Sequence, residues 1–444
     1  MKQIQIGLVS LGCSKNQVDA ERLLARFRRE GWQLQTDLGQ CDVAVVNTCG
    51  FIEDAKRESI EAILMACDQK KAGRLRSVVV TGCLSERYRE ELAAEIPEVD
   101  VVVGIGSNSE IVELIRRSLA GEKVQSYGSK DALSLEGDRV LGGPDYTAYV
   151  KVAEGCDNCC SYCAIPLIRG RFRSRPMEGI VEECRRLAAQ GVKELNLVAQ
   201  DTSRYGEDLY GEYRLPQLID AVCEIEGVHW VRVLYCYPDH LTDQLIDTIA
   251  RQPKVCKYID LPVQHASGRI LREMNRSGDR ASILALLRKL RSRIPGVTVR
   301  TTLIAGFPGE TGEDFEELSL LVQQGQFERL GCFAYSQEEG TPAGVRDDQL
   351  EPEERNRRAE LIVQQQMDIA FATSQAQVGR TLEVLVEGRE DGFWVGRSYM
   401  DAPDIDTRVY FTGGRDCRPG DFVPVRITEA RGYDVTGRAL EEAL

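Results

Sequence analysis

The chain has 444 residues, enough for two or three domains that each bury their own core. Hydrophobic residues make up 43% and charged residues 28%, which is typical of a globular protein, and no run of 18 apolar residues predicts a membrane span. The net charge of −14 argues against a broad nucleic-acid footprint, which needs a basic face, and fits a basic protein partner. Because the N-terminus lacks the apolar core and cleavage site of a signal peptide, we expect a cytoplasmic protein.

Residues 1–125 alternate apolar, strand-like runs with amphipathic helical patterns. The strand candidates are residues 4–12, 42–49, 77–83 and 99–106, and the helical pattern is clearest at residues 19–31. Buried strands that alternate with helices are typical of a parallel, doubly wound α/β sheet. We therefore predict such a sheet for the N-terminal domain.

Three cysteines, which we call the strand-end cysteines, each follow one of these strands: Cys13, Cys49 and Cys83. Each has a glycine beside it and a helical pattern after it, and residues 14–17 have the form of a capping box. The carboxyl ends of parallel strands meet at one edge of the sheet, and helix N-termini there favour thiolates. The pattern thus predicts an iron–sulfur cluster with one open iron. The alternative is three unrelated buried cysteines.

The next two segments are a linker and a second βα series. Residues 126–145 are polar and glycine-rich, which is typical of a linker. Residues 146–372 contain six strand candidates separated by helical patterns: residues 149–156, 194–201, 229–238, 258–265, 297–309 and 329–336. Since a closed barrel needs eight βα units, we predict a partial, open (βα)6 TIM-like barrel with its active site at the carboxyl ends of the strands.

The triple-cysteine loop, residues 156–163, follows the first strand of this series. Cys156, Cys160 and Cys163 have the spacing C-x3-C-x2-C. Cys159 lies inside the first gap, and we interpret it as a bystander because its neighbour Cys160 completes the motif. Three thiolates leave one iron of a 4Fe-4S cluster open for S-adenosylmethionine (SAM), and this loop resembles that of radical SAM enzymes. A structural zinc loop is the alternative, but no histidine lies near enough in sequence to complete one.

Residues 375–444 contain five short β-rich runs with glycine-rich turns, which predict a small antiparallel, OB-like barrel. This segment has nine arginines, no lysines and thirteen acidic residues, a net charge of −4. That composition opposes an RNA-binding platform, although arginines gathered on one face could still contact RNA. The acidic run Asp401, Asp404 and Asp406 is either a docking site for a basic partner or a solvated loop.

With both cysteine sets and the β-rich end in view, the chain resembles the radical SAM methylthiotransferases over nearly its whole length. It is most similar to the RimO-like branch, which modifies an aspartate of a small-subunit ribosomal protein. The resemblance rests on stretches such as GCSKN at residues 12–16, AIPLIRG at 164–170, LPVQHASGRILREMNR at 261–276 and GRSYMDAPDID at 396–406. The tRNA-adenosine branch usually has GCQMN- and VPYTRG-type stretches at the first two places. It is one alternative, and a non-enzymatic iron–sulfur carrier is another.

The resemblance implies a cofactor set, a reaction and a C-terminal TRAM domain. The triple-cysteine loop would hold a 4Fe-4S cluster that cleaves SAM to a 5′-deoxyadenosyl radical. The strand-end cysteines would hold a second 4Fe-4S cluster that carries the sulfur to be inserted. The radical would remove a hydrogen from the β-carbon of the target aspartate, and the product would be β-methylthioaspartate. The electron donor and the sulfur source are not named by the sequence.

Candidate SAM contacts lie at the strand ends of the predicted barrel: Gln200, Asp201, Gln264, Gly306, Gly309 and Glu310. A glycine-rich turn permits the close approach of backbone to a ligand, and ordinary loop structure is the alternative. Four arginines after the triple-cysteine loop could bind a carboxylate of SAM or of the target, or could form surface salt bridges: Arg169, Arg171, Arg173 and Arg175.

Overall fold

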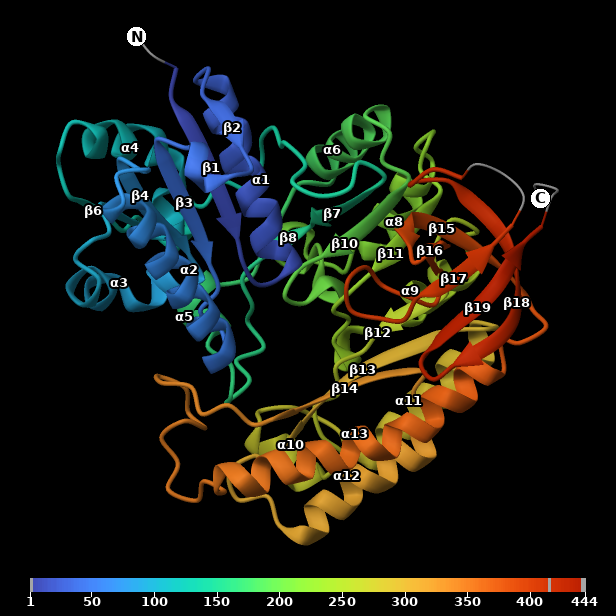
Figure 1. The fold of residues 1–444 in the computed structure, drawn as a ribbon. Helices are drawn as coiled ribbons and strands as arrows, with labels where there is room; N and C mark the ends of the chain where they lie inside the picture. The colour runs from blue at the N-terminus through green and yellow to red at the C-terminus, as the bar shows by residue number, and fades with distance from the viewer. Residues whose placement is uncertain (1–2, 414–416, 441–444) are drawn as a thin grey trace.

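The computed structural model describes residues 3–413 and 417–440 and divides into three units in chain order (Figure 1). A sheet flanked by helices forms the N-terminal unit, an open βα barrel the central one, and a closed β-barrel the C-terminal one. The last residues of the chain and Gly414, which ends one predicted β-run, lie outside the described ranges. None of the described helices is long and apolar enough to cross a membrane.

The N-terminal sheet has six strands, all parallel, in the order β2-β1-β3-β4-β5-β6. The strands are β1 (Gln5–Ser10), β2 (Gln33–Gln35), β3 (Val43–Thr48), β4 (Ser77–Gly82), β5 (Val101–Val103) and β6 (Val124–Ser126). The four predicted strands are confirmed as the centre of this sheet. The edge strands β2 and β6 were missed because three-residue, mostly polar runs carry no hydrophobic pattern.

Four helices cover the two faces of this sheet: α1 (Ser14–Arg29), α2 (Glu53–Lys71), α3 (Cys83–Glu95) and α4 (Ile111–Leu119). Apolar side chains of α2 and α3 share one core cluster with the sheet, and those of α1 and α4 share another. Every residue of β3 and β4 is buried, because helices cover both sides of the central strands. The doubly wound architecture is therefore as predicted.

The central barrel has six main strands in two hydrogen-bonded sets, β7-β10-β11 and β12-β13-β14. They are β7 (Thr147–Lys151), β10 (Glu194–Val198), β11 (Trp230–Val233), β12 (Tyr258–Asp260), β13 (Thr298–Ala305) and β14 (Arg329–Ala334). A single parallel bridge, Val231 with Val255, links the two sets. Since β7 and β14 do not pair with each other among the described residues, the predicted open barrel of six strands is confirmed.

Helices connect these strands and cover the outside of the barrel (Figure 1). The principal ones are α6 (Met177–Ala189), α8 (Leu215–Cys223), α9 (Asp243–Arg251), α11 (Arg280–Arg293), α12 (Gly312–Gly325) and α13 (Pro352–Gln375). The short helix α5 (Ile165–Arg169) instead packs against the N-terminal unit, where Ile168 meets Cys83. Thr311 and Asp314 make a capping box at the start of α12, which fixes the turn after β13. Helix α13 continues through residues 372–375, where the sequence predicts the last domain boundary.

The predicted linker at residues 126–145 is held firmly against both of its neighbours. Arg139 is almost fully buried and pairs with Glu21 of α1 at 2.5 Å and with Glu183 of α6 at 2.6 Å. Because each partner belongs to a different unit, this arginine joins the N-terminal sheet to the barrel. The segment is polar because it supplies ion-pair partners, and it does not act as a loose tether.

The C-terminal barrel closes in the order β15-β16-β17-β19-β18. Its strands are β15 (Thr381–Glu390), β16 (Phe393–Ser398), β17 (Val409–Thr412), β18 (Phe422–Arg431) and β19 (Asp434–Ala439). All five predicted β-runs are present. One detail differs from the expected antiparallel barrel, since β17 and β19 pair in parallel.

The predicted acidic docking run is largely a structural feature. Asp401 and Asp406 are turned into the junction with the central barrel, where Asp401 pairs with Arg329 of β14 at 2.6 Å. The Tyr258 hydroxyl of β12 donates to Asp406 at 2.6 Å. Only Asp404 is exposed. The expectation of an open acidic site was wrong because sequence alone does not show that the partners are residues of the same chain.

A second buried ion cluster joins the two barrels. Glu194 of β10 pairs with Arg397 of β16 at 2.6 Å and with Arg232 of β11 at 3.2 Å. Burial raises the pKa of Glu194, but Arg397 and Arg232 outweigh burial and lower it to about 2. The contribution of this carboxylate to stability is therefore present above about pH 4.5 and is lost as the pH falls toward 2.

We predict that Arg397→Met lowers the free energy of unfolding by about 3 kcal/mol, because the substitution leaves Glu194 under-compensated in a buried site. Arg408→Met is the matched control, since Arg408 pairs with Glu390 at the surface of the same barrel and should cost no more than about 1 kcal/mol. Urea denaturation at pH 7 measures both changes. Equal shifts for the two variants would contradict the structural role of Glu194.

Candidate active site

The strand-end cysteines lie together at the carboxyl edge of the N-terminal sheet. Cys13 directly precedes α1 and is its N-cap residue, Cys83 is the first residue of α3, and Cys49 directly follows β3. The predicted capping box does not form, because no side chain caps α1. Two of the three thiols thus lie at helix N-termini, where the helix dipole favours the thiolate.

Glycines allow the three strand ends to come this close. A Cβ atom on Gly12 would lie 2.8 Å from Cys49 Sγ, and one on Gly50 would lie 2.7 Å from the backbone of Leu84. Gly82 has φ = +100°, and a Cβ atom there would lie 2.4 Å from the Thr48 carbonyl oxygen. Any side chain at these positions would push the cysteines apart. The glycine beside each of these cysteines is therefore explained by the close approach of the neighbouring strand ends.

The pKa values of the three strand-end thiols are shifted in different directions. Burial, together with the neighbouring Cys83 and Cys13, raises the pKa of Cys49 to about 12. Burial also raises the pKa of Cys83, although Arg169 opposes the effect. Desolvation acts in the same direction on Cys13, but Lys15 and Arg169 outweigh it, so its pKa lies below the usual range.

The triple-cysteine loop lies at the carboxyl end of the first barrel strand. Burial raises the pKa of Cys156 to about 12 and that of Cys163 still further, and in each case the charge of Cys160 adds to the rise. Arg276 approaches this group, with its Nη1 at 3.8 Å from Cys160 Sγ. Cys159 is exposed and has φ = +48°, so it stands apart from the other three.

Within the described ranges, no three His, Cys, Asp or Glu side chains are arranged to hold a single metal ion. An iron–sulfur cluster makes a different demand, because each thiolate binds a different iron and the sulfurs stand further apart than the ligands of one ion. Two groups of three neighbouring thiols, each with an arginine beside it, fit that demand. The donor sets are thus of the kind that iron–sulfur clusters take.

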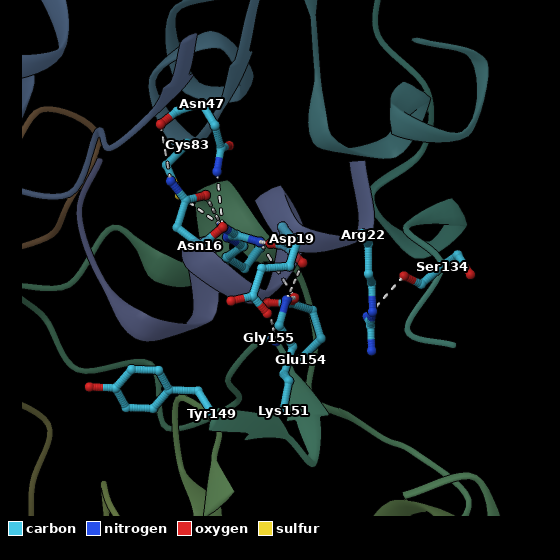
Figure 2. A network of polar contacts seen from close by, with 12 residues as sticks. Asn16, Asp19, Arg22, Asn47, Cys83, Ser134, Tyr149, Lys151, Glu154 and Gly155 are labelled. Atoms are coloured by element: carbon cyan, nitrogen blue, oxygen red, sulfur yellow. Dashed lines mark hydrogen bonds and ion pairs between the residues drawn. The ribbon is translucent and has the colours of Figure 1, made fainter. Parts of the chain in front are cut away.

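A buried ion network lies beside Cys83, one of the strand-end cysteines, and joins the N-terminal unit to the barrel (Figure 2). Asp19 of α1 pairs with Lys151 of β7 at 2.5 Å and with Arg169 of α5 at 2.6 Å. Glu154 pairs with the same two cations, at 2.7 and 3.4 Å. All four side chains are at most 4% exposed. Two carboxylates and two cations therefore balance their charges across the boundary between the N-terminal sheet and the barrel.

Arg169 extends this network to the strand-end cysteines. One of its terminal nitrogens donates to Cys83 Sγ at 3.1 Å and to the Asn16 side chain at 3.1 Å, while the other faces Asp19. Arg175 is also buried and pairs with Glu136 and Glu183. By contrast, Arg171 is 86% exposed, and Arg173 is half-buried and donates to the Asp131 and Lys130 carbonyls. The carboxylates that Arg169 and Arg175 bind are thus the chain's own.

The first two predicted SAM contacts, Gln200 and Asp201, lie directly after β10. The Gln200 amide donates to Glu154 at 3.0 Å, whereas its buried Oε1 has no hydrogen-bond partner among the described residues. Asp201 accepts bonds from Asn158 of the triple-cysteine loop at 2.9 Å and from Ser203 at 2.7 Å. Its pKa stays below the usual range because the neighbouring His240 outweighs the effect of burial.

The remaining predicted contacts lie after β12 and β13. Gln264 has φ = +69°, and the turn at residues 306–310 places Gly306 and Gly309 in the same left-handed region. The Glu310 carboxylate is engaged by Arg358 at 2.7 Å, by His265 at 3.2 Å and by the Gly306 N–H at 2.8 Å. Glu310 therefore shapes the turn from within.

A cavity of about 730 Å³ lies between the N-terminal sheet and the open side of the barrel. Phe51, two residues after Cys49, forms one part of its wall. Tyr162, which lies between Cys160 and Cys163, forms another, together with Gln264. Strands β13 and β14 and helix α13 complete the lining. Neighbours of both cysteine sets thus border one cavity.

Several residues of the site were not identified from the sequence. The four members of the ion network, Asp19, Lys151, Glu154 and Arg169, come from three separate segments, and only Arg169 stood out in a motif. Arg276 is the last residue of the family-like stretch 261–276, but nothing in the sequence showed that it would lie beside a cysteine. It donates to the Pro262 carbonyl at 2.7 Å and stacks 4.2 Å from the Tyr237 ring. Such pairings depend on the fold.

Comparison with known proteins agrees with this description. Family models match residues 5–104 (uncharacterized protein family UPF0004), 150–322 (radical SAM superfamily) and 378–440 (TRAM domain). Among solved structures, the radical SAM methyltransferase TsrM from Kitasatospora setae gives a TM-score of 0.58 at 15% identity, covering 77% of each chain. The cobalamin-dependent radical SAM enzyme OxsB gives 0.51 at 12% identity over 82% of this chain and 56% of that one. Both likenesses concern the fold alone.

The fold and the triple-cysteine loop define a radical SAM protein. Curated relatives show to which family within this class the chain belongs. One from Thermoanaerobacter sp. is 46% identical over 97% of this chain and 99% of its own, and one from Symbiobacterium thermophilum is 48% identical over 99% and 92%. Each is named ribosomal protein uS12 methylthiotransferase RimO. The chain therefore belongs to the RimO family of radical SAM methylthiotransferases.

We predict that Arg169→Met lowers the free energy of unfolding by about 3 kcal/mol and loosens α1 from the barrel, because Asp19 and Glu154 would then share Lys151 alone. Urea denaturation measures the first effect, and hydrogen exchange over Ser14–Arg29 the second. Arg171→Met, in the same segment but exposed, should change neither. Unchanged exchange in the Arg169 variant would contradict the role assigned to the ion network.

Proposed function

We propose that this enzyme inserts a methylthio group at the β-carbon of an aspartate of the small-subunit ribosomal protein uS12. The chain is a radical SAM methylthiotransferase by family, and its relatives carry the name of this substrate. We infer that a ribosomal protein, which must contact RNA, is basic, and a net charge of −14 on the enzyme fits such a partner. Because ribosomes are its source of substrate, we also propose a cytoplasmic location.

One observation carries this proposal: a single cavity is bordered by neighbours of both cysteine sets, Phe51 beside Cys49 and Tyr162 beside Cys160. Removal of a hydrogen and insertion of sulfur must occur at the same carbon atom. The target aspartate must therefore reach a place open to both clusters, and this cavity is such a place. A scaffold that only carried clusters would need no such cavity beside the two cysteine sets.

The cysteines hold the clusters in this proposal. Cys156, Cys160 and Cys163 bind one, and the strand-end cysteines bind the other. When bound, these clusters and SAM supply the radical and the sulfur atom, and an external protein supplies electrons. Arg276 and Arg169 place a positive charge beside each cysteine set and so favour thiolates over thiols.

SAM would lie against the triple-cysteine loop, at the carboxyl ends of β10, β12 and β13. The unpartnered Oε1 of Gln200 is a free acceptor for its amino group. Gln264 lines the cavity. Gly306 and Gly309 give the turn after β13 its left-handed backbone, and their N–H groups bond to Glu310 and to the Asp348 carbonyl, so any contact of this turn with SAM would use its other atoms. Asp201 positions the cysteine loop through Asn158, and Glu310 positions the turn.

Protein rather than RNA is the favoured substrate class. The C-terminal segment from residue 375 carries a net charge of −4 and no lysine. RNA-binding platforms depend on basic residues, so this composition opposes one. An anaerobic competition tests the substrate: reconstituted enzyme receives SAM, a low-potential reductant, sulfide, purified uS12 and unmodified tRNA. Mass spectrometry should find a methylthio group on the protein aspartate, whereas modification of tRNA alone would overturn the proposal.

The cysteine assignment predicts that each cluster, with the activity that depends on it, can be lost separately. After reconstitution, the wild-type chain should bind about eight irons, and alanine in place of either Cys156 or Cys83 should reduce this to about four. Cys156→Ala should also abolish SAM cleavage, whereas Cys83→Ala should cleave SAM without methylthiolating the target. Iron analysis and detection of 5′-deoxyadenosine measure these results.

Cys159→Ala is the matched control for this experiment, because Cys159 lies in the same loop but is exposed and set apart. It should keep the full iron content and both activities. A loss of one cluster in this variant would show that the ligand assignment within the loop is wrong.

A further inference from the structure

The outer edge of the barrel at β14 runs along the cavity. In the part of the chain that the structure describes, β14 pairs only with β13, so its other edge is unpaired. The cavity is lined by five consecutive residues, 332–336, at and after the end of this strand. Side chains alternate between the two faces of a strand, so a cavity on one face would meet only every second residue. Consecutive contacts place the cavity along the backbone edge.

The free backbone groups of this edge can be identified. The Tyr335 N–H donates to the Ala305 carbonyl of β13 at 2.9 Å. Because backbone groups of successive residues in a strand point in opposite directions, those of Cys332 and Ala334 point away from β13 and toward the cavity. An unpaired strand edge is a template for an added strand. An extended polypeptide in the cavity would find these donors and acceptors in register.

The charges and apolar groups of the cavity indicate the character of that polypeptide. All charged residues in its lining are acidic: Glu53, Asp54, Glu338 and Glu360. Glu338 is buried and already paired with Arg87 and Lys56, whereas the other three are exposed at the mouth. Glu53 also contacts Lys56, and Asp54 lies 3.9 Å from Arg57, both near the surface. Phe333, which is 55% exposed, adds an apolar contact beside the strand edge.

We propose that the target protein docks by an extended, basic segment that pairs with the free edge of β14. This inference rests on the proposed function. The segment lies along Cys332 and Ala334, its basic side chains face the acidic mouth, and its aspartate reaches the inner end of the cavity near Tyr162 and Gln264. Main-chain hydrogen bonds supply affinity that is independent of side chains, and the carboxylates select a basic sequence.

Two sets of enzyme variants test this docking by fluorescence anisotropy with labelled, purified uS12. Ala334→Pro removes the edge N–H and should weaken binding about fivefold, whereas Ala334→Ser keeps it and should bind like the wild type. The triple variant Glu53→Gln, Asp54→Asn, Glu360→Gln should weaken binding about tenfold at low salt and less at high salt. Glu113→Gln, Glu182→Gln, Glu429→Gln removes the same charge from distant exposed sites and should leave binding unchanged.

A substrate-side experiment keeps the test decisive if Ala334→Pro misfolds. Peptides around the target aspartate are N-methylated at one backbone position after another. Strand pairing should give loss of binding at every second position, since alternate N–H groups face the β14 edge. The docking proposal would be overturned if N-methylation weakened binding equally at every position, or at none, and the triple variant bound uS12 as tightly as the wild type. Methylthiolation by the wild type would still stand in that case. Failure of the wild type to modify uS12 at all would instead count against the proposed function.

Discussion

The structure depends on a small, fully buried set of opposite charges at the boundary between the N-terminal sheet and the barrel. Asp19 and Glu154 share Lys151 and Arg169, and the four charges balance. Removing charges from water costs several kcal/mol for each ion, so such a network gives little net stability. Its effect is geometric, because Asp19, the one member from the N-terminal unit, meets Lys151 and Arg169 only when the two units sit in one relative position. Arg169 carries that constraint to Cys83.

The ion network explains how residues near two distant cysteine sets come to border one cavity. Glu154 lies two residues before Cys156, and Asn16, which also contacts Arg169, lies three residues after Cys13. A shift of one unit against the other would therefore move the two sets apart. Arg139 of the linker and Glu194 at the C-terminal barrel likewise form buried ion pairs between units. Three buried clusters of charge thus fix the mutual placement of all three units.

Much of this architecture could be predicted from the sequence, and the reasons are local. Strands such as β3 and β4 are continuous apolar runs, and the cysteines that follow them lie where parallel strands must end. The spacing of the triple-cysteine loop likewise identified its chemistry. Short edge strands such as β2 could not be found, because backbone pairing with a neighbour creates them and leaves no hydrophobic pattern.

Long-range pairings account for the other errors. Asp401 and Asp406 look like a solvated acidic run, yet they meet Arg329 and Tyr258 of the barrel. Arg169 looks like a ligand-binding arginine, and it binds a carboxylate of its own chain. The SAM contacts at Gln200 and Gln264 remain predictions.

The central claim is that both clusters face one cavity at short range, and electron paramagnetic resonance tests it most directly. The reconstituted wild type and two single-cluster variants, Cys156→Ala and Cys83→Ala, are reduced anaerobically and their spectra recorded. The account predicts that the wild-type spectrum is broadened by spin–spin interaction and is not the sum of the two variant spectra. A spectrum equal to that sum, with no sign of coupling, would contradict the account.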